Sequence, residues 1–317
     1  MWAALAGGVG GAKLARGLAA IAPNEIDELR VIINTGDDFA LHGLQIAPDV
    51  DTVLYTLAGI ANPTTGWGIA DDTASAQAQL ARMGVDTWFW LGDRDLATHI
   101  MRTHWLASGF TLTEVTERLA RSLGIAPHIT LLPMTDAPVA TEVQTPAGWL
   151  AFQDYFVRRH HADPVRAVRF AGISRALPTT ATVTALRAAE VVVFCPSNPI
   201  VSIGPILTLR GVRQAIEHRE AEAHPRCCVA VSPIIGGRAL KGPADVMLAS
   251  MGFESSAVGV ARLYEGLVDI FVLDESDAHL APQIADLGMR PLVAPIIMTT
   301  PEESRTLARR IHRAVAV

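Results

Sequence analysis

A glycine-rich segment near the start of the chain is suited to binding a phosphate group. Gly7–Lys13 reads Gly-Gly-Val-Gly-Gly-Ala-Lys and joins a short apolar run to a helical pattern. Glycines let backbone N–H groups approach a phosphate closely, and a helix N-terminus adds positive potential. Lys13 stands where the dinucleotide-binding fingerprint needs glycine, and Ala12 and Leu14 break the Walker pattern. A tight turn packed on the sheet is the structural alternative to phosphate binding by Gly8, Gly10, Gly11 and Lys13.

Four aspartates follow in two groups at the same expected edge of the fold. Asp37 and Asp38 come directly after the second apolar run, and Asp49 and Asp51 open an apolar helical pattern. Ligands of open parallel sheets bind outside the carboxyl ends of the strands, so these carboxylates should face the crevice beside the glycine segment. They could bind a ribose hydroxyl, hold a hard cation beside phosphates, or cap turns and helices. Because unpaired carboxylates repel one another, the grouping indicates a cation or a basic ligand group among them.

Two polar loops in the second half also follow apolar runs. One spans residues 196–205, and the other spans residues 233–245 and combines two glycines with basic side chains. Such loops can donate hydrogen bonds to a phosphate or a base, and ordinary turns are the structural alternative. The residues predicted to contact the nucleotide are Ser197, Asn198, Gly204, Gly237, Arg238 and Lys241.

Two further residues between these regions could contact a ligand. Trp67 lies between two glycines and could stack against a planar ring, although a tryptophan in a loop can also simply be packed. Arg94 lies between two aspartates and could bind a ligand or form a structural ion pair with them.

The elements that must position these residues alternate between short apolar runs and helical patterns. This alternation predicts an α/β fold with a doubly wound parallel sheet. Several runs are rich in Val and Ile without polar alternation, as expected for strands that are covered on both faces. The expected strands are Ala3–Ala6, Arg30–Asn34, Glu190–Cys195, Arg226–Val231, Val268–Leu273 and Pro291–Pro295. The expected helices are Ala12–Ala20, Asp51–Ile60, Thr73–Met83, Val212–Glu222, Ser256–Glu265 and Glu302–Val315.

The middle of the chain has a different pattern. Leu96–Leu123 is expected to be helical, and His128–Leu132, Val139–Val143 and Trp149–Val157 resemble the short strands of an antiparallel meander. We therefore predict a smaller inserted α+β domain over residues 93–180. The core would then comprise residues 1–92 and 181–317.

Composition narrows the class of protein. The 317 residues carry 26 basic and 32 acidic side chains, a formal net charge of −6, so we expect no nucleic-acid or membrane partner. Half of the residues are hydrophobic, which is enough for a sizeable core. Three cysteines form no disulfide framework, and the N-terminus lacks the basic region of a signal peptide. We expect a cytoplasmic protein.

Taken together, the polar segments resemble those of one family. Their order, and above all the blocks at residues 91–99 and 197–206, resembles that of the 2-phospho-L-lactate transferases, the CofD/FbiA family, over nearly the whole chain. This family builds the deazaflavin coenzyme factor-420. The resemblance implies a Rossmann-like core, a smaller second domain and a homodimer.

The resemblance also implies a reaction. A donor linked to guanosine diphosphate carries lactate, or an enolpyruvyl or glyceryl relative, on its terminal phosphate. The terminal ribityl hydroxyl of the small molecule 8-hydroxy-5-deazariboflavin attacks that phosphorus, and GMP leaves with the assistance of Mg²⁺. The family places a deazaflavin-contacting aspartate at the position of Asp51, and Arg94 matches an arginine associated with the same ligand.

Phosphoryl transfer needs a metal held by acids around the phosphates, so the carboxylates acquire candidate roles. Asp37, Asp38 and Asp51 are candidate Mg²⁺ ligands. Asp38 and Asp51 are also candidates for the group that polarises the attacking hydroxyl. Asp51, Arg94 and Trp67 are the candidate deazaflavin contacts.

Two other classes of protein remain as alternatives. A related regulatory family shares the glycine-rich start and the acid pair, binds nucleotide sugars and controls carbon metabolism or wall synthesis. This chain carries Phe39–Gly43 instead of that family's Gly-Gly-Ser-Ser run, although it has the block at residues 91–99. A nicotinamide oxidoreductase is disfavoured because Lys13 breaks its fingerprint.

Overall fold

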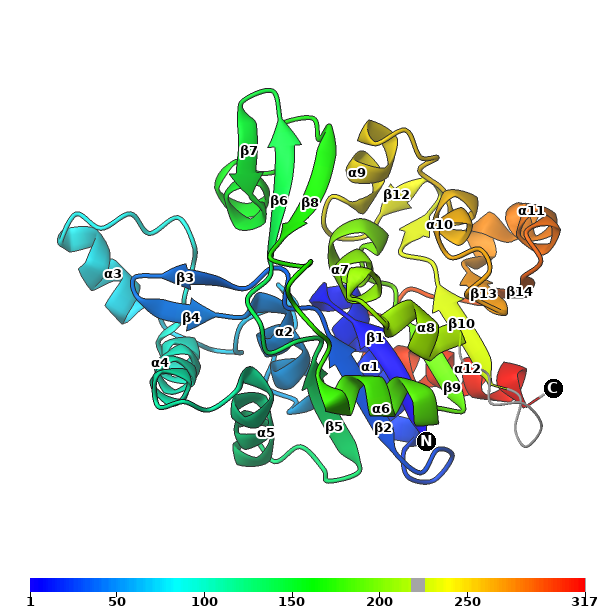
Figure 1. Cartoon of the computed structure of the whole chain (residues 1–317), viewed down its shortest axis with the longest axis horizontal. Coiled ribbons are helices and arrows are strands. Elements are labelled where there is room, and N and C mark those ends of the chain that lie inside the picture. Colours follow the sequence, from blue (N-terminus) through cyan, green and yellow to red (C-terminus); the bar gives the residue numbers. More distant parts are fainter. Residues whose placement is uncertain (218–225, 317) are drawn as a thin grey trace.

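A seven-stranded parallel sheet forms the centre of the molecule (Figure 1). The computed structural model describes residues 1–217 and 226–316. The strand order is β14-β13-β10-β9-β1-β2-β5, which is the Rossmann order with one further strand. All neighbours in this sheet are parallel, so an α/β doubly wound fold is confirmed. The strands are β1 (Trp2–Ala6), β2 (Leu29–Ile33), β5 (Ile129–Pro133), β9 (Val191–Phe194), β10 (Cys227–Val231), β13 (Ile270–Leu273) and β14 (Arg290–Val293).

Helices cover both faces of the sheet and create two hydrophobic cores. Side chains of β1 alternate between them, with Ala3 and Leu5 in one core and Trp2, Ala4 and Ala6 in the other. One face packs against α1 (Gly8–Ile21), α2 (Pro48–Leu57), α5 (Leu112–Ser122) and α12 (Pro301–Val315). The other packs against α6 (Thr180–Ala188), α7 (Gly204–Thr208), α8 (Val212–Glu217), α9 (Ala244–Ser250), α10 (Ala257–Leu263) and α11 (Ala281–Asp286).

Smaller elements project from the carboxyl edge of the sheet (Figure 1). A hairpin of β3 (Phe39–Leu41) and β4 (Leu44–Ile46) extends away from the body beside α3 (Ser75–Arg82) and α4 (Asp93–Ala107). A three-stranded antiparallel sheet combines β6 (Ala140–Thr145), β7 (Gly148–Ala151) and β8 (Ala167–Ala171). The remaining elements are the hairpin β11 (Ile234–Ile235) and β12 (Arg238–Ala239) and the short helical segments η1 (Asp154–Arg158), η2 (Pro199–Ile203) and η3 (Glu275–Leu280).

The middle of the chain differs from its prediction in two places. The assignment of His128–Leu132 to an antiparallel meander is wrong, because β5 pairs in parallel with β2 at the edge of the main sheet. Residues 129–133 therefore join the core sheet, although they fall within the predicted insertion. The predicted strand Trp149–Val157 is also too long, since β7 ends at Ala151 and η1 follows.

The predicted helix Leu96–Leu123 is divided into α4 and α5. A capping box explains the division, because the Thr111 hydroxyl accepts from the Glu114 backbone while Glu114 accepts from the Thr111 backbone. The other predicted helices are present with shifted ends, and residues 218–222 of one prediction lie outside the described residues.

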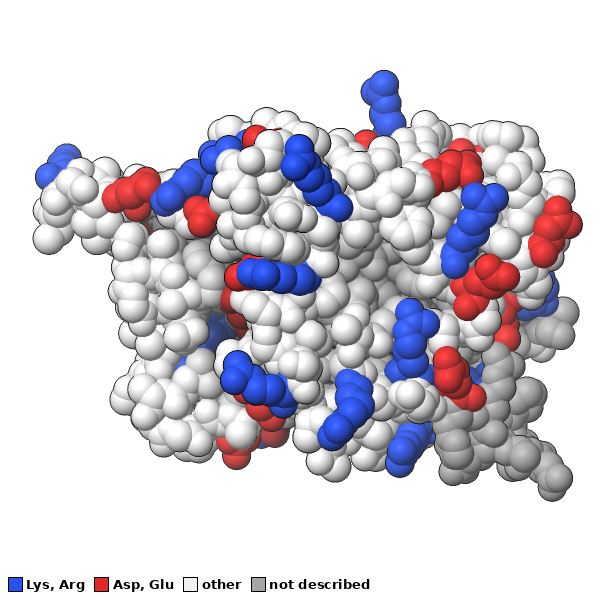
Figure 2. Space-filling model, turned by 45° about the horizontal axis from the view of Figure 1, so that its top comes forward, with Lys and Arg blue, Asp and Glu red and all other residues white. Residues whose placement is uncertain are grey.

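Charged groups of both signs are scattered over the face shown in Figure 2. No helix within the described ranges is long and apolar enough to cross a membrane.

Candidate active site at the carboxyl edge of the sheet

The glycine segment lies at the point where the sheet reverses its winding. Strands β1 and β9 are neighbours, and the chain leaves them toward opposite ends of the sheet. The Gly7 backbone N–H donates to Ser197 Oγ at 3.1 Å, and the Ser197 hydroxyl donates back to the Gly7 carbonyl at 2.8 Å. The two loops that leave β1 and β9 are thus joined at this point, and the buried Ser197 hydroxyl is occupied by the join.

Close packing explains why several of the glycines are required. A Cβ atom at Gly10 would lie 2.3 Å from the Pro196 carbonyl oxygen, and one at Gly11 would lie 2.4 Å from Ser197 Oγ. Gly8 has a φ of 61°, a left-handed conformation that favours glycine. The predicted tight turn is therefore present, and it places the N-terminus of the 14-residue helix α1 at the crevice.

Asp49 joins the glycine segment to the end of β2. Its Oδ1 accepts from the Gly8 backbone N–H at 2.7 Å, and its Oδ2 accepts from the Asn34 side-chain amide at 2.9 Å. A Cβ atom at Gly7 would lie 2.5 Å from this Oδ2, so the carboxylate fits only against glycine. Burial raises the pKa of Asp49 to about 6, against the effect of these two hydrogen bonds.

Asp37 and Asp38 have buried oxygens without partners. The Oδ1 atom of each is buried and accepts no hydrogen bond from any described residue. Burial, followed by the neighbouring Asp49 and Asp38 carboxylates, raises the pKa of Asp37 well above its usual range. Burial also raises the pKa of Asp38, and the Arg102 guanidinium opposes this rise. Orphaned carboxylate oxygens that repel one another suit a hard cation, which takes oxygen ligands.

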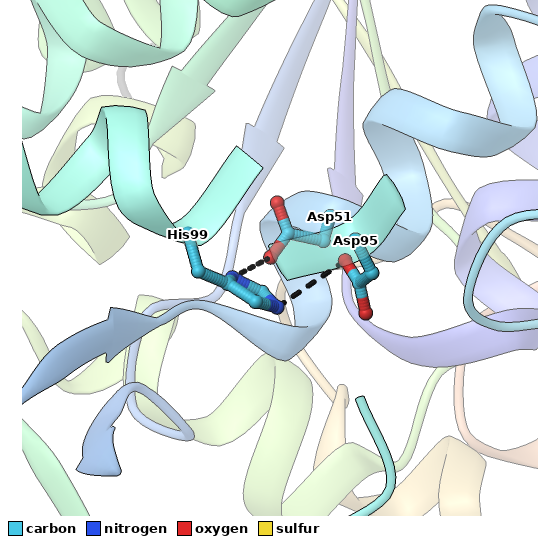
Figure 3. A group of neighbouring side chains, drawn as sticks. All are labelled: Asp51, Asp95 and His99. Atoms are coloured by element: carbon cyan, nitrogen blue, oxygen red, sulfur yellow. Dashed lines mark ion pairs between the residues drawn. The ribbon is translucent and has the colours of Figure 1, made fainter. Parts of the chain in front are cut away.

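Asp51 belongs to a second group, which we call the α2–α4 cluster: Asp51, Tyr55, Asp95, His99 and Arg102. The Arg102 guanidinium forms a two-point contact with Asp51, in which Nη1 lies 3.0 Å from Oδ2 and Nη2 donates to Oδ1. His99 lies between the carboxylates of Asp51 and Asp95 (Figure 3), with Nδ1 3.6 Å from Asp51 Oδ2 and Nε2 3.2 Å from Asp95 Oδ1. The Tyr55 hydroxyl donates to Asp95 Oδ1 at 2.6 Å.

Three members of this cluster have metal-ligand chemistry. Single ligand atoms from Asp51, Asp95 and His99 all lie within 4.8 Å of one another. However, the Arg102 guanidinium already neutralises Asp51 and engages both of its oxygens. A metal ion would have to displace a buried arginine here, whereas Asp37 and Asp38 present free oxygens.

A cavity of about 480 Å³ adjoins both groups of carboxylates. Asp38 and Arg102 line it together, and Phe39, Leu106, Val139 and Arg175 contribute further wall. It lies between the β3–β4 hairpin, the α4–α5 connection and the β6–β8 sheet. The lining combines apolar side chains with a few charged groups, which is typical of a small-molecule site.

Basic side chains approach the glycine segment from the first and second halves of the chain. Lys241 donates to the Thr65 carbonyl oxygen, so the loop after β12 reaches the loop that carries Gly66 and Trp67. Burial and then the nearby Lys241 charge lower the pKa of Lys13. The two ammonium groups therefore lie close enough to repel each other beside the N-terminus of α1, as expected of a site for an anion.

Several predicted contact residues also have structural roles. Asn198 caps η2, since its Oδ1 accepts from the Ile200 and Val201 backbones. Gly204 packs closely, because a Cβ atom at this position would lie 3.2 Å from the Pro199 carbonyl oxygen. Gly237, with a φ of 79°, lies in the turn of the β11–β12 hairpin, and the exposed Arg238 follows it as the first residue of β12.

Arg94 and Trp67 are exposed and do not belong to the lining of the cavity. The Arg94 guanidinium donates to the Ala70 carbonyl oxygen at 3.3 Å. Trp67 is 44% exposed and meets Trp90 edge to face, with 5.8 Å between the ring centroids. Both side chains thus leave polar or aromatic surface available to a ligand.

Four members of the α2–α4 cluster were not predicted from the sequence: Tyr55, Asp95, His99 and Arg102. Residues 95, 99 and 102 follow the spacing of one helix face, which is a signal that the sequence contains. Their partner Asp51 lies 51 residues from Arg102, however, and only the packing of α4 against α2 brings them together.

Comparison with known proteins agrees with the fold and the order of the site segments. The model of the family described as 2-phospho-L-lactate transferase CofD matches residues 3–290. A protein of Kitasatospora aureofaciens named phosphoenolpyruvate transferase is 43% identical over 313 residues, covering 96% of this chain and 95% of the relative. A protein of Methanosarcina acetivorans named 2-phospho-L-lactate transferase is 40% identical over 304 residues, which cover 96% of this chain and 95% of the relative.

Among solved structures, the chain is similar in fold to a member of the UPF0052 family from Bacillus halodurans. The TM-score is 0.63 at 14% identity, and the match covers 100% of this chain and 98% of the other. At this identity the likeness concerns the fold alone.

Proposed function

The chain belongs to the CofD family of 2-phospho-L-lactate transferases, and we propose that it transfers a phospho-acid group to a deazaflavin in factor-420 biosynthesis. The ribityl hydroxyl oxygen of 8-hydroxy-5-deazariboflavin forms a bond to the terminal phosphorus of the donor. The bond from that phosphorus to the oxygen of the GMP moiety breaks, and GMP leaves. The hydroxyl proton passes to a carboxylate of the site.

The observation that carries this proposal is the pair of orphaned carboxylates beside the glycine segment. Asp37 and Asp38 present buried Oδ1 atoms without partners at the reversal point of the sheet. Phosphoryl transfer depends on positioning and on neutralisation of charge, and both need such groups around the phosphates.

Asp37 and Asp38 fit Mg²⁺ better than Asp51 does. Their free oxygens are the ligands that Mg²⁺ prefers, whereas Arg102 engages both oxygens of Asp51. When bound, Mg²⁺ would neutralise phosphate charge in the transfer. We therefore assign the metal to Asp37 and Asp38, and Asp51 stays a candidate only if the contact with Arg102 opens.

The remaining residues divide between the two substrates. Asp38 and Arg102 line the cavity, and Asp51 contacts Arg102. The two carboxylates would orient the attacking hydroxyl and receive its proton. The exposed side chains of Arg94 and Trp67 would contact the deazaflavin. The guanosine nucleotide and its phosphates would lie on the glycine segment and the basic loops, at Gly8, Gly10, Gly11, Lys13, Ser197, Asn198, Gly204, Gly237, Arg238 and Lys241. Ser197 and Asn198 would act mainly through the loop that they brace. We also propose a homodimer.

The test is a reaction of the purified protein with 8-hydroxy-5-deazariboflavin, Mg²⁺ and each of three guanosine diphosphate-linked donors, carrying lactate, enolpyruvate or glycerate. GMP release and the mass of the product are followed. We expect one GMP for each phospho-acid deazaflavin formed with at least one donor. A folded protein that binds guanosine nucleotides but forms no product with any donor would contradict the proposal and favour a nucleotide-binding regulator.

A further inference from the structure

Helix α4 presents a buried charged face to helix α2. Asp95, His99 and Arg102 follow one another at intervals of four and three residues, so they project from the same side of the helix. Arg102 is only 1% exposed. An arginine that is removed from water to this degree is costly unless its donors are engaged by a fixed anion.

Asp51 is the anion that pairs with Arg102, and this contact fixes the orientation of the Asp51 carboxylate. Two guanidinium nitrogens meet its two carboxylate oxygens, which fixes the plane of the carboxylate as well as its position. Lysine has one ammonium group and cannot reproduce this planar fork. The Arg102–Asp51 contact therefore sets an orientation that a simple charge would not.

The other members of the α2–α4 cluster hold Arg102 in turn. Arg102 Nη1 lies 3.1 Å from His99 Nδ1 and, because a guanidinium can only donate, this ring nitrogen accepts. The proton of a neutral His99 is then on Nε2, which faces Asp95 Oδ1 at 3.2 Å. Tyr55 donates to the same oxygen. The side chains thus form a continuous row from Tyr55 through Asp95 and His99 to Arg102 and Asp51, in which His99 Nε2 approaches Asp95 but makes no hydrogen bond with a described residue.

Arg102 also faces the cavity and the first group of carboxylates. It lines the cavity together with Asp38, and it is the cation that opposes the rise in the pKa of Asp38. Its Nε is buried and has no hydrogen-bond partner among the described residues. One guanidinium thus contacts Asp51 and lines the cavity with Asp38, and the proposed function assigns these two carboxylates to the reacting hydroxyl.

We infer that Arg102 is a positioning residue, which fixes the Asp51 carboxylate in one orientation next to the cavity wall that Arg102 shares with Asp38, where the reacting hydroxyl would lie. The inference rests on the proposed function, because it concerns the same site. Arg102 itself need not touch the substrates, since it acts through the carboxylate that it fixes. The surrounding contacts would keep the guanidinium in place at the wall of the cavity.

The experiment compares Arg102→Ala, Arg102→Lys and the control Arg121→Ala, which removes an arginine from an exposed ion pair with Glu117. Folding, affinity for guanosine diphosphate, kcat and KM are measured for each. We expect kcat to fall about 100-fold in both Arg102 variants, the effect of misplacing a reacting group by about 1 Å. The KM for the donor should change by less than about threefold, because the donor phosphates bind elsewhere. The control should retain the kcat of the wild type.

Chemical rescue separates positioning from support of the fold. Since Arg102 lines the cavity, guanidinium ions can enter the space that Arg102→Ala leaves. At non-denaturing millimolar concentrations they should restore part of kcat in Arg102→Ala and none in Arg102→Lys, where the lysine side chain occupies the space.

Several outcomes would overturn the inference. These are a folded Arg102→Ala protein within about twofold of the wild-type kcat, a loss that guanidinium does not relieve, or failure of both variants to fold. If Arg102→Ala alone fails to fold, a folded Arg102→Lys protein with lowered kcat supports the inference and one with wild-type kcat overturns it. An inactive wild-type protein would instead overturn the proposed function, and this inference with it.

Discussion

Asp49 and Asp51 lie two residues apart on α2, yet they belong to different parts of the site. Asp49 faces the glycine segment and shares its surroundings with Asp37 and Asp38, and these three form no ion pair with a described residue. Asp51 faces α4 and is neutralised by a buried arginine. The comparison teaches that aspartates close together in the sequence can differ in charge compensation: one group has no basic side chain paired with it, whereas Asp51 is paired with Arg102. Only the first invites a metal ion.

The largest expected effect follows from removing a carboxylate that has no built-in partner. Asp38→Asn should lower kcat about 10³-fold, because it deletes both a proposed metal ligand and a group that orients the hydroxyl. Steady-state kinetics check this, with the exposed Asp86→Asn as the control. Stability should not fall, since one repelling charge disappears, and an Asp38→Asn protein with unchanged kcat would remove this residue from the chemistry.

Removing the carboxylate of Asp51, which is paired with Arg102, should mainly lower the stability of the fold. Asp51→Asn leaves the Arg102 guanidinium buried without its anion, so we expect a loss of about 3 kcal/mol in the free energy of unfolding. Urea unfolding of Asp51→Asn and Asp38→Asn measures the difference between the two regions. Equal stabilities for the two variants would mean that the distinction between them is wrong.

A substitution in the loop after β12, which carries Lys241, should have a smaller effect, and only on nucleotide binding. Lys241→Met should weaken the binding of guanosine diphosphate about tenfold, because one charge-assisted contact to a phosphate is lost. Isothermal titration calorimetry checks this against Arg121→Met, which alters an exposed arginine on α5. An unchanged affinity would place the phosphates away from this loop.

The smallest effect is a pH dependence of stability. The folded protein holds a proton on Asp49 up to about pH 6, whereas the unfolded chain releases it near the usual pKa of aspartate. Between about pH 4 and 6 the folded state therefore binds more protons, and this group makes stability fall as pH rises, by at most about 1.4 kcal/mol per pH unit. Between about pH 4 and 6, the melting temperature should fall less steeply with rising pH in Asp49→Asn than in the control Asp86→Asn. Parallel curves would contradict the assignment.

The parts of the fold that the sequence predicts best are those with strong local signals. The six predicted strands of the main sheet are apolar runs, and each is present; all but the edge strand β14 are largely buried. Strand β5 is also an apolar run, but proline and glycine separate it from the next two short runs, which suggested a meander. Only its pairing with β2 identifies its place in the main sheet. The sequence does not reveal β2 as the partner of β5, because the two strands are far apart in the chain. The place of β5 at the edge of the sheet depends on the packing of α5 against the same core.

The site shows the same division. The glycine segment, Asp37, Asp38 and the polar loops could be chosen as candidates because each follows a predicted strand, and Asp49 and Asp51 because they open a predicted helix. The partner of Asp51 was not found, because an arginine within a helical pattern resembles a solvated residue until a second helix covers it. The sequence likewise gives no sign that Ser197 and Asn198 brace the loops from which a ligand would be held.

Binding of Mn²⁺ in place of Mg²⁺, followed by electron paramagnetic resonance without any turnover, tests the central distinction most directly. The wild type, Asp37→Asn, Asp38→Asn and Asp51→Asn proteins would be titrated with the metal in the presence of guanosine diphosphate. We expect Asp37→Asn and Asp38→Asn to lose at least about tenfold in metal affinity. Folded Asp51→Asn should retain the affinity of the wild type. Loss of the metal in Asp51→Asn with retention in the other two would contradict the distinction.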